Sequence, residues 1–474
     1  MVTEGAETNS NKNGLQSAIP SDSAVLLNSR NSLVIFGAAF AYTFVVAVAI
    51  EKFVLPVLLP QLHAGHGLMV GHDSVSFHAM ADEMATRIRT HGWNEWKLIP
   101  NLQGVVGISA AIYALTGVHE PIILVPIYSA LYALSVTCVY RIVLLLTGSE
   151  SGALSAAAAF LFFPSAAMIY ADLHKDAWSC AGLLLLIAAW VETETRERAT
   201  LVHLVCLIIA CCLALSLIWV VRPYLIKLAL GGFLLGWLTL MLSNVVLGNN
   251  WRREWKRSIG YVVVLTVMAT ISVSSSAPLM ESSVAPPTFI VKPNDAKRAD
   301  AKGAANQTLL SSHNPLILHT IGAILSVRQG VLNTPGGSIL DKDVRFPSFM
   351  HFVFYVPRAL QIGLFAPFPD MWFERGMTAG SRLMRLVSGA EMSIAYVLLL
   401  GFFFLIPSIR RDRIVPFLFV IVTCIAVVEV MSLTMPNIGT LYRMRYPMFM
   451  LVVGLGAAGW AILLAKIRAR NKPA

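Results

Sequence analysis

The sequence has little charge. Only 13% of its residues are Asp, Glu, Lys or Arg and 56% are hydrophobic, whereas a soluble domain is about 25% charged and about 45–50% apolar. This composition excludes an ordinary soluble domain and indicates a polytopic membrane protein. The formal net charge is +10, but the basic residues form short clusters beside apolar runs, where they orient the protein and meet anionic lipid. We therefore expect membrane lipids, and no nucleic acid, as partners.

Cysteine is scarce and is absent from the long polar loops. The chain has six cysteines, and every one lies inside an apolar run. This placement excludes a disulfide framework or a thiolate metal site in the loops. We interpret the cysteines as small apolar helix residues. They are Cys138, Cys180, Cys206, Cys211, Cys212 and Cys424.

Few ionisable residues interrupt the apolar runs, namely Glu51, Arg141, His203 and Glu429. An ion-coupled transporter would place paired charges at mid-depth in the membrane. Because Glu51 and Arg141 lie toward the ends of their runs, Glu429 is the best intramembrane candidate. One acid is weak support for a transporter or flippase.

Ten apolar runs reach the length of about 17 to 25 residues that a spanning helix needs. They are 32–57, 121–146, 152–171, 177–193, 201–221, 227–247, 258–279, 389–409, 414–435 and 447–467. Two further apolar pieces, 102–118 and 351–368, would disturb the charge pattern as spans, so we expect interfacial or re-entrant helices there. The predicted fold is an all-α transmembrane bundle with about ten spans, and up to twelve if both pieces cross.

Basic clusters predict the orientation of this bundle. They follow the spans at 196–198, 252–257, 410–413 and 466–472, and all four fall on one side, which is the cytoplasmic side by the positive-inside rule. We therefore expect a multi-pass protein of the inner (plasma) membrane with both termini in the cytoplasm.

The chain divides into four parts on the same evidence. Residues 1–31 are rich in Ser, Asn and Gly and predict a disordered cytoplasmic tail. Residues 32–279 form an N-terminal transmembrane module, whose external loops are 58–120 and 171–176. Residues 280–388 form a long external region with an interfacial helix, and residues 389–474 a C-terminal module with a basic cytoplasmic tail.

The segment 71–90, GHDSVSFHAMADEMATRIRT, is unusually polar for this chain. A carboxylate in lipid costs several kcal/mol, so we place the segment outside the hydrocarbon, with Asp73 and His78 as site candidates. The spacing of His63, His66 and His72 matches no compact helical ligand pair, so we predict no dedicated metal site there. Asp73 also suits a helix N-cap, which is the structural alternative.

A second external feature is the turn ADLHKD at 171–176, which offers Asp172, Lys175 and Asp176. A polar turn between helices often serves solubility alone. Its position on the same side as Asp73, however, means that the two acidic segments could converge above the bundle.

The third feature is LYRMRYP, just before the last span. Arg443 and Arg445 are external against the positive-inside bias, and guanidinium groups bind phosphate in a bidentate manner. We expect them, with Tyr442, to bind a lipid phosphate or diphosphate; snorkelling to ordinary headgroups is the alternative. Arg222 is a weaker candidate for the same task, as are three arginines of the long loop, Arg328, Arg345 and Arg358.

With these motifs the chain resembles the GT-C superfamily of integral-membrane glycosyltransferases, which includes protein mannosyltransferases, the aminoarabinose transferases of lipid A and bacterial envelope-polysaccharide enzymes. The resemblance covers residues 32 to about 195 and the last forty or so. Its elements are Asp73 with Phe77 and Ala79, the helix 110–117, the turn PSAAMIYADLHKD at 164–176, and YRMRYPMFMLVVGLG at 442–456. Two departures are that Asp172 and Asp176 compete for one role and that the long loop has no matching motif.

The resemblance implies transfer of a sugar from a polyprenyl-phosphate donor to a glycan, lipid or protein acceptor on the non-cytoplasmic face. Asp73 would be the general base, assisted by Asp172 or Asp176, and displacement would invert the anomeric centre. Arg443 and Arg445 would hold the leaving phosphate, with Lys175 or Arg222 in reserve and His78 and Tyr442 nearby. No cofactor is assigned, and a divalent metal is left open. The alternatives are an O-antigen or exopolysaccharide polymerase or ligase that uses external arginines, and, with less support, the transporter or flippase.

Overall fold

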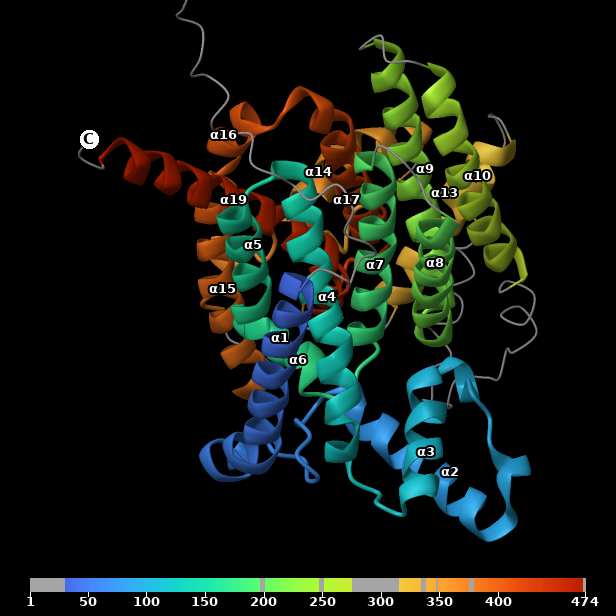
Figure 1. Cartoon of the computed structure of the whole chain (residues 1–474). Coiled ribbons are helices and arrows are strands. Elements are labelled where there is room, and N and C mark those ends of the chain that lie inside the picture. The colour runs from blue at the N-terminus through green and yellow to red at the C-terminus, as the bar shows by residue number, and fades with distance from the viewer. Residues whose placement is uncertain are drawn as a thin grey trace, which may run out of the picture.

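The computed structural model describes residues 30–196, 201–246, 251–274, 315–333, 338–346, 348–374 and 379–471. Within these ranges the regular elements are helices (Figure 1), and the only β-type pairings there are two isolated bridges. The predicted all-α class is confirmed. Nearly all of the predicted tail 1–31 and the first part of the long external region lie outside the described residues.

Ten α-helices lie between residues 30 and 274 of the described chain. Their bounds are α1 Arg30–Ala49, α2 Asp73–His91, α3 Gly104–Thr116, α4 Val125–Thr147, α5 Glu150–Phe162, α6 Ala167–Tyr170, α7 Asp176–Thr195, α8 Leu201–Val221, α9 Pro223–Val246 and α10 Trp251–Ser274. In the second half the bounds are α13 Pro315–Leu332, α14 Phe349–Phe365, α15 Ala379–Leu399, α16 Phe402–Leu405, α17 Ile414–Thr434, α18 Ile438–Met444 and α19 Tyr446–Arg470.

Eight helices of the described chain are long and apolar enough to cross a membrane, and a ninth crossing results if the bent pair α5–α6 is one span. Large apolar side chains such as Leu33, Ile208 and Val246 are exposed on their outer faces, as expected for contact with lipid. The protein is therefore membrane-embedded. The predicted run 258–279 is described only as far as Ser274, and 102–118 and 351–368 form the shorter apolar helices α3 and α14.

Small residues set the distances between packed helices. An added Cβ at Gly232 of α9 would lie 2.4 Å from Val427 of α17, and one at Gly236 would lie 2.1 Å from the hydroxyl of Thr423. Membrane helices associate through such close backbone approach, because lipid provides no hydrophobic drive between them. All six cysteines are free, which agrees with their predicted role as small helix residues.

The predicted span over 152–171 is not one straight helix, because α5 and α6 are bent by 62° at their junction. Phe163 is extended and Pro164 opens a short 3-10 turn, as proline cannot continue the preceding helical hydrogen bonds. The buried carboxylate of Glu391 accepts the hydrogen bond from the freed Ser165 N–H. The bend therefore turns the chain into the 171–175 loop.

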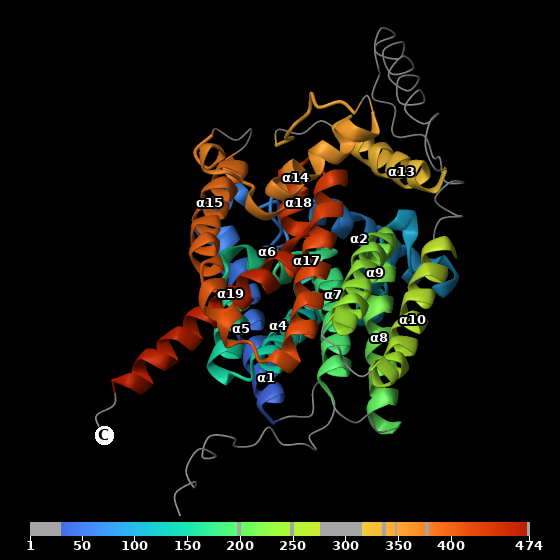
Figure 2. The same cartoon turned by 90° about the horizontal axis from the view of Figure 1, so that it is seen from above.

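The bundle has two distinct ends. At the basic end, Arg413 donates to the Thr195 carbonyl (3.2 Å) and Lys466 to Ser408 (2.8 Å). The loop end contains residues 59–72, 171–175 and 435–445, and Arg222. Figure 2 shows α13, α14 and α18 toward the loop end and the C-terminus toward the other.

Candidate functional site

The first loop is held against the end of α1, which widens into a π-helix over Ile50–Leu58 that contains Pro56. Gly67 has φ +75°, and a Cβ there would lie 2.7 Å from the Cβ of Glu51. Only glycine allows both this backbone conformation and this approach. The loop therefore folds back on α1 and brings His72, the residue before α2, to the 171–175 loop.

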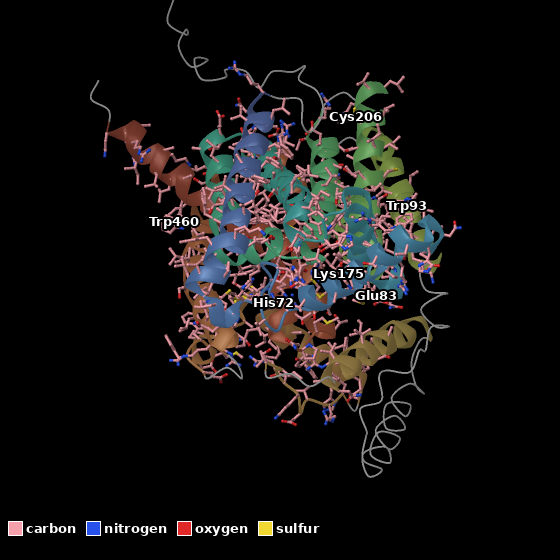
Figure 3. All side chains as sticks on the ribbon, turned by 90° about the horizontal axis from the view of Figure 1, so that it is seen from below. His72, Glu83, Trp93, Lys175, Cys206 and Trp460 are labelled. Carbon is pink, nitrogen blue, oxygen red and sulfur yellow. The ribbon has the colours of Figure 1, made fainter. Side chains whose placement is uncertain are left out.

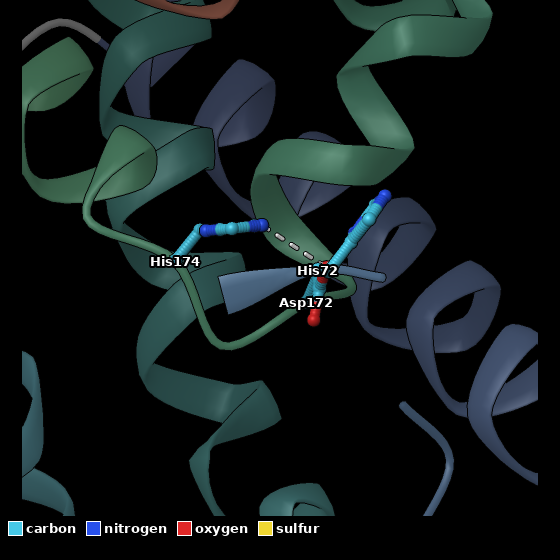
Figure 4. Close-up of side chains that lie close together, drawn as sticks. All are labelled: His72, Asp172 and His174. Atoms are coloured by element: carbon cyan, nitrogen blue, oxygen red, sulfur yellow. Dashed lines mark hydrogen bonds and ion pairs between the residues drawn. The ribbon is translucent and has the colours of Figure 1, made fainter. Parts of the chain in front are cut away.

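Three side chains from these two loops form what we name the His–Asp cluster: His72, Asp172 and His174 (Figure 4). Asp172 Oδ2 lies 2.7 Å from His72 Nδ1 and 3.3 Å from His174 Nε2. Its other oxygen accepts from the Leu173 N–H at 2.9 Å. Burial alone would raise the pKa of Asp172, but the imidazoles of His174 and His72 outweigh burial and hold this pKa well below its ordinary value.

Arg443 of α18 connects this cluster to Asp73. Its Nη1 lies 3.1 Å from His174 Nε2, and its Nη2 lies 4.0 Å from Asp73 Oδ2. The Asp73 side chain is 66% exposed. The alternative of Asp73 as a helix N-cap is wrong, because the cap position belongs to His72 and no side chain caps the helix there. Asp73 therefore stays accessible at the edge of the site.

The two acids of the 171–176 turn have different partners. Asp176 begins α7 and forms a buried ion pair with Arg222, at 2.6 Å from Oδ1 to Nη2. Arg222 also donates to the Ser179 hydroxyl at 3.2 Å. Because the two charges of this pair neutralise each other, we interpret Asp176 and Arg222 as structural residues beneath the site. Asp172, in contrast, contacts two imidazoles.

Lys175 lies between Asp172 and Asp176 in the 171–176 turn, on the same face of the bundle as His72 (Figure 3). Its amino nitrogen is 5.5 Å from the centre of the Phe77 ring. Burial, and next the neighbouring Arg222 cation, lower the pKa of Lys175 to about 8. The lowered pKa means that burial and Arg222 disfavour the charged amino group, and an anion beside it would favour the charged form.

An apolar cavity of about 630 Å³ lies among α1, α4, α7 and α8. Toward the loop end it is lined by Pro126 and Trp178, and Trp178 is two residues after Asp176. Toward the basic end it reaches Cys206 and the buried pair Arg141–Glu192, at 3.0 Å. Figure 3 shows Lys175 and Cys206 far apart on the bundle. The cavity therefore extends from Trp178, near the start of α7, into the membrane-spanning part.

Two predicted substrate-binding residues lie apart from these groups. Arg445 is 1% exposed and donates to the carbonyls of Ile362 (3.2 Å), Gly363 and Ala366, which close α14. Tyr442 donates to Glu391 at 2.5 Å, and burial followed by this carboxylate raises the pKa of the Tyr442 hydroxyl well above its ordinary value. Both side chains hold the helices together, so we do not carry them into the site.

His78 belongs to a second imidazole group. It lies 3.2 Å from the Tyr113 hydroxyl and its ring is 4.7 Å from that of His66, while His119 contacts Asp82 at 2.5 Å. This group fastens α2 to α3. Arg328 and Arg358, in the long loop, contact Tyr355 (3.2 Å) and Asp341 (3.2 Å) respectively, and Arg345 donates to backbone carbonyls.

Sequence reasoning missed three residues that the structure shows to matter. His174 was given no role, although it stands beside Asp172. Glu192 and Glu391 were not among the intramembrane acids, although both lie near the ends of apolar runs. An inspection of each acid within those runs would have found the two glutamates, but their partners are 51 and 226 residues away.

Comparisons of the chain with protein-family models, with curated proteins and with solved structures found no match. We therefore infer the function of the protein from the chemistry and geometry of the loop end.

Proposed function

We propose that this protein is a membrane glycosyltransferase that moves a sugar from a polyprenyl-phosphate donor to an envelope acceptor at the loop end. One observation carries the proposal: an exposed carboxylate and two cations lie at the loop end, where an apolar cavity lined by Trp178, two residues after Asp176, extends into the membrane-spanning bundle. A polyprenyl-phosphate sugar has the complementary parts, which are a reacting sugar, an anion and a long apolar chain.

The donor phosphate would be held by Arg443 and Lys175. The Arg443 side chain is 25% exposed, so its planar fork can reach a phosphate and bind it with two hydrogen bonds. Lys175 carries the lowered pKa described above, and a phosphate beside it would favour its charged form. Arg222, which is paired to Asp176, adds a second positive charge near Lys175.

Asp73 would act as the general base. The acceptor hydroxyl oxygen forms a bond to the anomeric carbon, and the bond from that carbon to the phosphate oxygen breaks. The polyprenyl phosphate leaves with the electron pair, and the hydroxyl proton passes to Asp73. Attack opposite the leaving phosphate would invert the anomeric centre. Arg443, 4.0 Å from Asp73, would stabilise the charge on the departing phosphate.

The isoprenoid chain would occupy the cavity among α1, α4, α7 and α8. The lining is largely apolar, and its few charged members, Arg141 and Glu192, neutralise each other. An apolar chain can enter without leaving polar groups unpaired. By the positive-inside rule the basic end would face the cytoplasm and the loop end the outside of an inner membrane.

A polymerase or ligase that uses external arginines remains the second candidate, because Arg443 serves that chemistry equally well. Glu429, on which a transporter would depend, does not line the apolar cavity. Its carboxylate oxygens are buried and without a hydrogen-bond partner among the described residues. The transferase and the polymerase differ in their need for Asp73.

The proposal is tested by transfer of labelled sugar from polyprenyl-phosphate donors in membranes that contain matched amounts of wild type, Asp73→Asn or Glu83→Gln. Glu83 is a matched control because it is an exposed acid of the same helix α2 whose ion pair is with Arg87. We expect Asp73→Asn to lose about 100-fold or more, the scale of a general base, and Glu83→Gln to keep wild-type transfer. Equal rates in all three would remove Asp73 from the mechanism, and no transfer by wild type with any donor would overturn the proposal.

A further inference from the structure

We propose that the His–Asp cluster binds one divalent transition-metal ion of the Mn²⁺ or Zn²⁺ type through His72 Nδ1, Asp172 Oδ2 and His174 Nε2. The ligand atoms come from two loops, and all lie within 4.8 Å of one another. The site itself is independent of the proposed function. Only the use of the ion in sugar transfer rests on that function.

The spacing of the three atoms fits a coordination sphere. Two of the separations are 2.7 and 3.3 Å. Metal bonds of about 2.0–2.2 Å to nitrogen and oxygen place neighbouring ligands roughly 3 Å apart. Small side-chain movements would therefore complete the sphere, with no change in either loop.

Arg443 would compete with a metal ion for His174. Its Nη1 atom lies 3.1 Å from His174 Nε2, and the same Nε2 atom lies 3.3 Å from Asp172 Oδ2. A guanidinium group can only donate, so a hydrogen bond from Arg443 uses the Nε2 lone pair that a metal ion also needs. A bound ion would therefore replace Arg443 on His174.

The surroundings orient the ligands and offer one further carboxyl oxygen. Leu173 N–H holds the other oxygen of Asp172, which is the outer-shell support typical of metal ligands. Glu51 is 5% exposed, its Oε2 has no hydrogen-bond partner in the described chain, and it lines a small cavity with Asp172. That cavity measures about 10 Å³, close to the space one water needs.

The donor set also selects the ion. Imidazole nitrogen suits zinc and iron better than magnesium or calcium, which prefer oxygen ligands, and the carboxylate of Asp172 is a ligand type that also suits manganese. Three protein ligands leave at least one position for water or substrate oxygen. In the proposed reaction a bound ion would add positive charge beside the donor phosphate, while Arg443 would be released from His174.

The test measures metal on the full-length protein, purified in detergent with a tag that contains no histidine. After chelator treatment the protein is titrated with Mn²⁺, Zn²⁺ or Mg²⁺ without any donor, and bound metal is counted by elemental analysis. Mn²⁺ electron spin echo spectra with ¹⁵N-histidine labelling then report imidazole ligation in the unaltered chain. The variants are Asp172→Asn, His174→Gln and Arg443→Gln, with His351→Gln as an exposed histidine control.

We expect about one Mn²⁺ or Zn²⁺ per wild-type chain, with histidine nitrogen coupling to Mn²⁺ and much weaker Mg²⁺ binding. Asp172→Asn and His174→Gln should weaken binding by more than about 100-fold, beyond the range for outer-shell partners, and His351→Gln should not. Arg443→Gln should bind as tightly as wild type or more tightly, because it removes a competing cation; this result cannot arise from misfolding. Wild type without bound metal, undiminished binding in Asp172→Asn, or loss of metal in Arg443→Gln would each overturn the site.

Discussion

The two ends of the bundle each carry a buried ion pair anchored on α7. At the loop end the pair is Asp176–Arg222, at 2.6 Å, and at the basic end it is Arg141–Glu192, at 3.0 Å. The four side chains are at most 11% exposed. By charge and burial the two ends look alike, and neither pair alone would identify a functional site.

They differ in the groups around each pair. At the basic end the remaining groups satisfy one another: Arg196 lies 4.0 Å from Glu192 and 2.5 Å from His203. At the loop end Asp73 is exposed, Arg443 is shared between Asp73 and His174, and the amino nitrogen of Lys175 lies 5.5 Å from the centre of the Phe77 ring. A buried ion pair by itself indicates a structural role. We infer a functional site only where charged groups beside such a pair are still able to bind a ligand.

The largest expected effect is common to both ends. Asp176→Ala and Glu192→Ala would each leave a buried arginine uncompensated, which costs about 3–5 kcal/mol. We therefore expect a marked fall in the thermal unfolding midpoint for both in detergent. Apolar double replacements, Asp176→Leu with Arg222→Met and Glu192→Leu with Arg141→Met, should recover stability at both ends but sugar transfer only at the basic end. Equal recovery of transfer would contradict the distinction between the ends.

The next effect is confined to the loop end. Arg443→Gln should reduce kcat/KM for sugar transfer by about 10²–10³, the usual loss when one preorganised donor to a developing charge is removed. Arg411→Gln, an exposed arginine of the basic end, is the control and should leave kcat/KM unchanged. Wild-type kinetics in Arg443→Gln would exclude Arg443 from phosphate binding.

The sequence predicted an all-helical membrane bundle, because a span is a local property: about twenty consecutive apolar residues indicate a helix without reference to the rest of the chain. It did not predict the bend at Pro164, where the apolar run continues but the helix is interrupted. The proline was visible, yet its effect depends on Glu391, which accepts the freed Ser165 N–H from a distant helix.

The site was predicted only in outline. That Asp73 and the 171–176 turn share one side followed from span parity, but the contact between His72 and Asp172 joins residues 100 positions apart. Arg443 and Arg445 lie two positions apart and look equivalent in the sequence. In the folded chain Arg443 contacts His174, whereas Arg445 donates to the carbonyls that close α14. Such differences arise from tertiary packing, which residue type and spacing do not encode locally.

The cavity offers a third test with a smaller effect. Ala130 lines it, and Ala130→Trp would fill space that the isoprenoid chain is proposed to use. We expect KM for a long-chain donor to rise about tenfold, which corresponds to about 1.4 kcal/mol, with little change for a short-chain donor. Leu235→Trp, on a lipid-exposed face of α9, is the matched control. Equal sensitivity of both donors would place the chain elsewhere.

The smallest effect concerns the second imidazole group. Burial, followed by the neighbouring His66, lowers the pKa of His78, against the opposing influence of Asp82 and Glu120. The folded protein therefore disfavours the protonated ring, and stability should fall as the pH drops below about 6.5, where an unfolded histidine takes up its proton. His78→Phe should show a smaller fall in unfolding midpoint between pH 7.5 and 5.5 than wild type. An identical fall would mean that His78 does not contribute.

The most direct test of the central claim is photolabelling of the protein with polyprenyl phosphate that carries a diazirine either beside the phosphate or near the far end of the chain, followed by peptide mapping. The phosphate-side probe should label the loop end, around Lys175, Trp178 and Arg443, and the far probe should label the cavity around Cys206 and Leu207. Both labels should be displaced by unmodified polyprenyl phosphate. Labelling in the reverse order, or labelling by both probes only on the outer lipid-facing surface, would contradict the proposed site.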